Sequence, residues 1–176
     1  KLYYNGFSNR TIWPLFHYFP VYTSYSPQTW EAYCRVNNAF FETVVELYEP
    51  GDSIWIQDYQ LMLLPGILRE RFPDAKIGFF LHIPFPSFEV FRLLPWRREI
   101  VEGILGSDLI GFHTYSYARH FLSSVQRLLG HESHLSRLMI DNRPVRADIF
   151  PLGIDYDRYA EYQDNPEISG EIEALK

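Results

Sequence analysis

The segment KIGFFLH at residues 76–82 is a short, continuous apolar run that ends on a histidine. Such a run is typical of a strand in a parallel sheet that is covered on both faces. Pro84 and Pro86 follow directly, and proline restricts both its own backbone and that of the preceding residue. The segment therefore predicts a buried strand, with His82 held in a fixed orientation where the strand ends.

Similar units surround this strand. Each apolar run is separated from the next by a stretch with helical periodicity, and this alternation predicts an α/β fold with a Rossmann-like, doubly wound parallel sheet. The expected strands are 53–58, 76–82, 107–113 and the beginning of 143–155. The expected helices are 26–51, 61–72, 88–94, 96–106 and 115–130.

Local signals mark several helix ends. Pro65 is expected in the first turn of its helix, where a missing N–H costs little. Ser87 and Thr114 are candidate N-caps, and Gly106 and Gly130 are candidate helix stops. Asp155 and Asp157 are expected to cap or begin a short helix.

Composition excludes several classes of function. The chain has 176 residues, enough for one domain, and its net charge of −6 argues against general nucleic-acid binding and against attraction to anionic membranes. Its single cysteine, Cys34, cannot form an internal disulfide, and no apolar run approaches the length of a membrane span. We therefore expect a cytoplasmic protein with no nucleic-acid or membrane partner.

Polar side chains follow three of the expected strands. Asp58, His82 and His113 each end one strand, and in open parallel sheets ligands bind beyond these carboxyl ends. Asp58 could cap the next helix or accept sugar hydroxyls. His82 could be a buried histidine bonded to backbone or a group that donates to a sugar hydroxyl, and the prolines favour the second reading. His113 directly precedes a helix start and is expected to be structural.

The chain is rich in aromatic residues, at 18%. Most are expected in the core or an interface, and a minority in stacking against a sugar ring. Tyr4, Trp13 and His17 bracket a turn or short helix that could form a sugar-binding wall or pack under a loop. No GxGxxG, GxxxxGK[ST] or GxSxG motif occurs, and no HxxxH or CxxC pattern supports a metal site.

Five segments in register resemble the trehalose-6-phosphate synthase family, glycosyltransferase family 20, over roughly residues 3–158. They are YNGFSNRTIWPLFHY (4–18), WIQDYQLMLLP (55–65), FFLHIPFPSFEVFRLLP (79–95), DLIGFHTYSYARHFL (108–122) and PLGID (151–155). The resemblance implies a retaining glucosyltransferase of the two-domain GT-B fold. Such an enzyme transfers glucose from UDP-glucose to glucose-6-phosphate and releases α,α-trehalose-6-phosphate and UDP, with no cofactor and no metal.

The resemblance also implies roles for individual residues. Tyr4 and Trp13 would line the glucose-6-phosphate pocket, and Asp58 would hold hydroxyls of that acceptor. His82 would meet the transferred glucose near the reacting centre, so Asp58 and His82 are the candidate catalytic residues. A front-face reaction needs no protein nucleophile, and the protein then contributes positioning and electrostatics.

The chain departs from the family pattern at one motif. Where the family reads HDYHL, this chain reads QDYQL, with Gln57 and Gln60 in place of both histidines. Glutamine still donates and accepts hydrogen bonds but does not titrate near neutral pH. This change keeps open a sister transferase that uses another acceptor, such as a glucosylglycerol-phosphate synthase. A catalytically silent, sugar-phosphate-sensing homologue is a further alternative.

The resemblance predicts a partial domain arrangement. Residues 1–158 correspond to the N-terminal, acceptor-side domain without its first strand, and residues 159–176 to an acidic tail or the start of a linker. We expect the donor-binding C-terminal domain in the longer parent protein, so that residues 1–176 alone would be inactive. The parent could also form homo-oligomers and carry a fused phosphatase domain.

Overall fold

The computed structural model describes residues 1–160 and 166–175. The strands are β1 (Ser53–Gln57), β2 (Lys76–Leu81), β3 (Leu109–Phe112), β4 (Ser133–His134), β5 (Arg137–Ile140) and β6 (Arg143–Ile149). The α-helices are α1 (Trp13–Phe16), α2 (Pro27–Leu47), α3 (Leu64–Arg71), α4 (Phe88–Phe91), α5 (Arg97–Leu105), α6 (Tyr115–Leu129), α7 (Tyr156–Ala160) and α8 (Pro166–Leu175). The π-helix η1 (Leu2–Ile12) opens the chain, and η2 (Pro20–Tyr22) and η3 (Tyr59–Leu61) are short 3₁₀ turns.

The strands form one mixed sheet in the order β1-β2-β3-β6-β5-β4. The four strands expected from the sequence are the parallel ones, β1, β2, β3 and β6, so the α/β class is confirmed. Strands β5 and β4 extend the sheet in antiparallel fashion and were not expected. A tight turn at Asp141 and Asn142, both with positive φ, joins β5 to β6.

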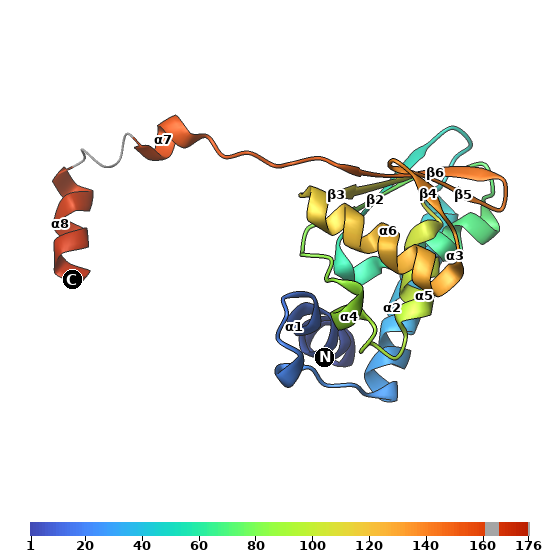
Figure 1. The fold of residues 1–176 in the computed structure, drawn as a ribbon, viewed down its shortest axis with the longest axis horizontal. Coiled ribbons are helices and arrows are strands. Elements are labelled where there is room, and N and C mark those ends of the chain that lie inside the picture. The colour runs from blue at the N-terminus through green and yellow to red at the C-terminus, as the bar shows by residue number, and fades with distance from the viewer. Residues whose placement is uncertain (161–165, 176) are drawn as a thin grey trace.

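Helices α2 to α6 lie on one side of the sheet (Figure 1). The parallel strands follow one another in a single direction, and right-handed crossovers that advance in one direction place their helices on the same face. On the other face, Trp55 of β1 is 74% exposed. The second helical layer of a doubly wound sheet is not among the described residues.

Aromatic side chains fill much of the core beneath the sheet. Phe7 of η1 is fully buried and contacts the rings of Trp30, Tyr33 and Trp96. A second group of rings, formed by Phe16, Phe85, Phe91, Phe112 and Phe121, packs between α1, the loop after β2 and α6. The core therefore takes up many of the aromatic residues, as expected.

The helix ends agree in part with the sequence signals. Thr114 Oγ1 accepts a hydrogen bond from the backbone N–H of Tyr117, and Gly130 ends α6 in the left-handed conformation with φ 77°. Pro65 lies in the first turn of α3, but the helix expected at 61–72 is divided into η3 and α3. Ser87 precedes α4 without a side-chain capping bond, which corrects that expectation.

A charged cluster fastens the amino ends of the central strands. Asp108 Oδ1 accepts hydrogen bonds from Arg69 at 2.7 Å and from Arg143 at 3.2 Å. Its other oxygen, Oδ2, accepts from the backbone N–H of Ile77 at 2.8 Å. This clamp joins α3, β2, β3 and β6 at the edge of the sheet opposite the carboxyl ends.

The C-terminal helices α7 and α8 lie away from the sheet and its helices (Figure 1). Asp155 Oδ1 accepts from the backbone N–H of Arg158 in the first turn of α7, so the expected cap is present. The tail or linker expected at 159–176 stays a prediction, and residues 161–165 and 176 lie outside the described residues. None of the described helices is long and apolar enough to cross a membrane.

Candidate functional site

Three polar side chains meet at the carboxyl edge of the parallel strands. Asp58 follows β1, His82 follows β2, and His113 follows β3. The imidazole rings of His82 and His113 lie 5.4 Å apart. The expectation that these strand ends gather at one edge is confirmed.

Asp58 has an unusual backbone conformation. Its φ of 69° and ψ of 176° place it in a region that residues with a side chain rarely adopt, at a cost of about 1–3 kcal/mol. Its carboxylate Oδ1 accepts a hydrogen bond from the backbone N–H of His82 at 3.1 Å. The carboxylate makes no capping bond to η3, so the interpretation of Asp58 as a helix cap is wrong.

Buried hydrogen bonds hold the loop after Asp58 against α2. Tyr33 is fully buried, and its hydroxyl donates to Tyr59 O and accepts from the Met62 N–H. The amide of Asn37, also fully buried, donates to Gln60 O and accepts from the Leu64 N–H. These bonds fix the backbone beyond Asp58 and thereby maintain its strained conformation.

The hydroxyl of Tyr3 adds a further link from η1 to the same loop. It donates to Gln60 O at 3.1 Å. Burial, with a smaller effect of the neighbouring Tyr59 and Tyr4, raises the pKa of Tyr3 to about 12. The hydroxyl therefore stays protonated and remains a donor at neutral pH.

The ring of His82 packs against the ring of Phe80. The two rings lie 4.6 Å apart, and Phe80 also contacts His113 at 5.0 Å. Gly111 of β3 makes this possible, because a Cβ there would lie 2.5 Å from Cδ2 of Phe80. The ring of His82 is exposed, and its Nε2 lies 2.8 Å from Oε1 of Gln57.

His113 lies in this cluster, as its place at a strand end predicts, although its own role was expected to be structural. Burial, and next the neighbouring His82, lower the pKa of His113, while Asp58 raises it. Its position one residue beyond β3 is equivalent to that of His82 beyond β2, and this equivalence was the signal for a role in the site. His113 was expected to be structural because the next residue, Thr114, caps a helix.

The proline-rich loop after His82 is fastened at two points. Nδ1 of His120 on α6 lies 3.0 Å from Phe85 O, and the hydroxyl of Tyr18 accepts from the backbone N–H of Ser87. Phe85 itself is fully buried between the two prolines. The rigid exit from β2 that the sequence predicted is therefore held by side chains from α6 and from the N-terminal segment.

Tyr4 and Trp13 lie on the N-terminal segment beside this edge. They are 52% and 43% exposed, and Trp13 stacks on His17 with ring centroids 4.1 Å apart. Trp13 and Asn9 line a hollow of about 370 Å³, and Asn9 Oδ1 accepts from the hydroxyl of Tyr59, the residue after Asp58. The structure thus joins the aromatic segment to the Asp58 loop, and no contact of Trp13 with Asp58 or His82 is recorded in the described part of the chain.

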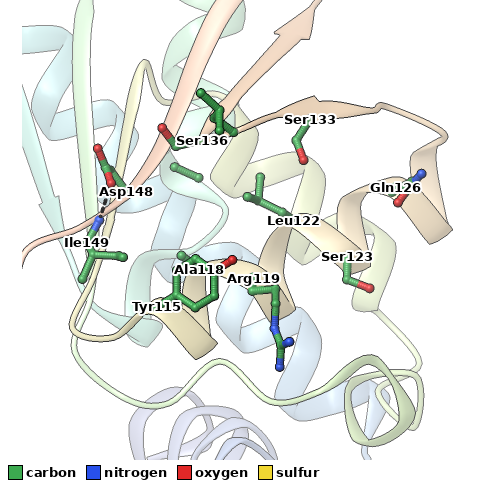
Figure 2. Close-up of a pocket in the computed structure, with 12 residues that line it drawn as sticks. Tyr115, Ala118, Arg119, Leu122, Ser123, Gln126, Ser133, Ser136, Asp148 and Ile149 are labelled. Carbon is green, nitrogen blue, oxygen red and sulfur yellow. Dashed lines mark hydrogen bonds between the residues drawn. The ribbon is translucent and has the colours of Figure 1, made fainter.

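A separate cavity of about 470 Å³ lies between α6 on one side and β4, the turn that follows it, and β6 on the other (Figure 2). Tyr115, Arg119 and Ser123 line it from the helix, and Ser136 and Asp148 from the strand side. Asp58, His82 and His113, at the carboxyl ends of the parallel strands, form what we call the edge cluster. The lining of the cavity includes none of these three residues. The two features are therefore distinct.

The edge cluster suits polyhydroxy ligands. A partly exposed carboxylate and two imidazoles offer several hydrogen-bond acceptors and donors, and exposed aromatic rings stand nearby. In residues 1–160 and 166–175, no group of three or more His, Cys, Asp or Glu side chains is placed to hold a metal ion.

Comparison with known proteins identifies the family of the chain. The family model described as glycosyltransferase family 20 matches residues 1–176. The α,α-trehalose-phosphate synthase (UDP-forming) A of Dictyostelium discoideum is 49% identical over 173 residues, which cover 98% of this chain and 24% of that protein. The chain thus spans about a quarter of the length of this relative.

Two solved structures share the fold. The α,α-trehalose-phosphate synthase of Burkholderia xenovorans, in complex with glucose-6-phosphate, is 34% identical with a TM-score of 0.84, over 97% of this chain and 40% of that one. The N-terminal domain of a Candida albicans trehalose-6-phosphate phosphatase is 37% identical with a TM-score of 0.82, over 99% of this chain and 38% of that one. With the family model matching along its whole length, the chain belongs to glycosyltransferase family 20.

Proposed function

We propose that the protein containing this chain transfers glucose from UDP-glucose to glucose-6-phosphate with retention of configuration, and that residues 1–158 form its acceptor-side domain. The observation that carries the proposal is the strained backbone of Asp58, whose carboxylate is tied to the main chain of His82. Strain of this kind persists where the surrounding structure maintains it, and it concentrates at functional sites. Here it places a carboxylate and an imidazole side by side at the carboxyl edge of the sheet.

The residues have distinct roles in this proposal. Asp58 accepts hydrogen bonds from two hydroxyls of glucose-6-phosphate, and Tyr4 and Trp13 form the wall of the acceptor pocket. His82 contacts the transferred glucose. The bond between the anomeric carbon of that glucose and the UDP oxygen breaks, and the acceptor's anomeric oxygen forms the new bond on the same face. The acceptor proton passes to the leaving phosphate, so that UDP and α,α-trehalose-6-phosphate are the products.

Several further features belong to the same proposal. UDP-glucose is a co-substrate, and neither a cofactor nor a metal takes part. The protein acts in the cytoplasm. A phosphatase domain elsewhere in the parent protein is compatible with the similarity to the N-terminal domain of a trehalose-6-phosphate phosphatase.

The test is an acceptor comparison with the full-length protein. It is supplied with UDP-glucose and either glucose-6-phosphate or glycerol-3-phosphate, and the product is identified by mass and retention. A disaccharide phosphate formed from glucose-6-phosphate alone is expected. Product with glycerol-3-phosphate alone would instead identify the sister transferase, and no product with either would favour a silent, sensing homologue.

A further inference from the structure

Gln57 and His82 are neighbours on the same face of the sheet. Gln57 is the last residue of β1 and is paired in register with Phe80 of β2. His82 lies two residues beyond Phe80, so its side chain projects to the same side. In this arrangement Gln57 Oε1 and His82 Nε2 are 2.8 Å apart, a normal hydrogen-bond distance.

The chemistry of the two atoms determines which one donates. An amide oxygen only accepts hydrogen bonds, so the hydrogen of this bond belongs to Nε2 of the imidazole. In a neutral ring Nδ1 then carries the lone pair. Within residues 1–160 and 166–175, no partner is recorded for His82 Nδ1, and the ring is exposed.

We propose that Gln57 is a positioning residue that keeps the hydrogen of His82 on Nε2 and so presents Nδ1 as the free nitrogen that accepts a hydrogen bond from a sugar hydroxyl. The identity of the sugar rests on the proposed function above. The orientation of His82 does not, because it follows from the contact with Gln57. His82 therefore acts as an acceptor towards the ligand.

The choice of glutamine keeps a second titrating group out of the contact. The groups that face His82 are Asp58, which bonds its backbone N–H, the ring of His113, and Gln57. Gln57 has no proton to gain between about pH 5 and 8, so it remains an acceptor throughout. A histidine at this position, as in the HDYHL pattern, loses its acceptor nitrogen when it is protonated.

The first experiment measures the tautomer. The full-length protein is labelled with ¹⁵N-histidine, the His82 signals are assigned with a His82→Ala variant, and spectra are recorded at about pH 7.5. The hydrogen is expected on Nε2 in the wild type and divided between both nitrogens in Gln57→Leu. Gln126→Leu, an exposed glutamine on α6, is the matched control and should leave the wild-type signal. A dominant hydrogen on Nδ1 in the wild type would overturn the proposal.

Kinetics provide the second readout. Gln57→Leu should lower kcat/KM roughly 3- to 10-fold, which corresponds to the loss of one neutral hydrogen bond. In a His82→Ala background the same change should have less than about a twofold effect, because Gln57 acts through His82. If the losses in kcat/KM from Gln57→Leu and His82→Ala were additive in the double variant, Gln57 would not act through His82.

Two variants keep the test decisive if Gln57→Leu does not fold. Gln57→Glu retains an acceptor oxygen and should keep the hydrogen on Nε2, whereas a mixed tautomer in this variant would count against the proposal. Gln57→His should lose activity between about pH 7 and 5.5 more steeply than the wild type, and an unchanged profile would count against it. If the wild type transfers no glucose, the proposed function fails, while the tautomer spectrum still decides the role of Gln57.

Discussion

The carboxylate of Asp58 accepts a hydrogen bond from the backbone N–H of His82, with 3.1 Å between Oδ1 and N. This bond joins the end of β1 to the end of β2 through a side chain at the point where the regular strand ladder stops. It holds the carboxylate in place from the His82 side, while the buried hydroxyl of Tyr33 holds the following loop from α2. The strained residue is therefore supported from both directions.

Asp58→Gly and Asp58→Ala should reveal the backbone strain. Both variants remove the carboxylate, but only alanine keeps a Cβ at φ 69°. At an ordinary position alanine stabilises a protein relative to glycine by about 0.4–1 kcal/mol. Here we expect the reverse order, with the glycine variant more stable by about 1 kcal/mol in urea unfolding of the full-length protein. An alanine variant as stable as the glycine variant would show that Asp58 is unstrained.

Gly111→Ala should disturb the histidine cluster from below. The added methyl group would lie 2.5 Å from Cδ2 of Phe80, so the ring must move, and with it the surface on which His82 and His113 rest. We expect a stability loss of about 1–3 kcal/mol and a kcat/KM reduced about 10-fold or more. Gly78→Ala is the matched control, because its nearest neighbour would be 3.7 Å away. If both changes had equal effects on stability and kcat/KM, displacement of the Phe80 ring would not be the cause.

Asp108→Asn should weaken the clamp at the opposite edge of the sheet. The carboxylate serves two partly buried arginines and one backbone N–H, and an amide cannot accept all three bonds. We expect a loss of about 2 kcal/mol in the free energy of unfolding. Glu31→Gln, which alters an exposed pair with Arg35 at 3.9 Å, should change it by less than about 0.5 kcal/mol. A similarly small effect of Asp108→Asn would assign the clamp no stabilising role.

Because of His113, the stability of the protein against unfolding should fall as the pH becomes acidic. Burial, and then His82, lower the pKa of His113 below its usual value of 6.5. Just below pH 6.5 the unfolded state therefore binds more protons than the folded state. The stability that neutral His113 contributes above this pH is lost as the pH falls through the lowered pKa. The drop in urea midpoint between about pH 7.5 and 5.5 should be smaller in His113→Gln than in the wild type. Equal drops would contradict the lowered pKa.

Much of the parallel core can be predicted from the sequence, because each of its elements carries a local signal. The apolar run before His82 is strand β2, Thr114 caps α6, and Gly130 ends it, as their residue types predict. The edge cluster follows from one general rule, namely that side chains after parallel strands meet at the carboxyl edge. Asp58 and His82 could therefore be placed together before the structure was known.

Other features depend on contacts that local signals do not encode. Strands β4 and β5 are only two and four residues long, too short for their sequence to show a strand period, and β4 consists of the polar residues Ser133 and His134. The Asp141–Asn142 pair is the one local signal of the tight hairpin turn that follows. The π-helical η1 is a rare conformation that propensities do not predict. The contact of Gln57 with His82 depends on strand register, which an apolar run leaves open.

The crystal structure of the full-length protein with UDP and glucose-6-phosphate tests the central claim most directly. The account predicts both Asp58 carboxylate oxygens within about 3.2 Å of sugar hydroxyls, with Tyr4 and Trp13 lining the acceptor pocket and His82 facing the donor side. A glucose-6-phosphate molecule bound elsewhere, with Asp58 directed away from it, would contradict the account.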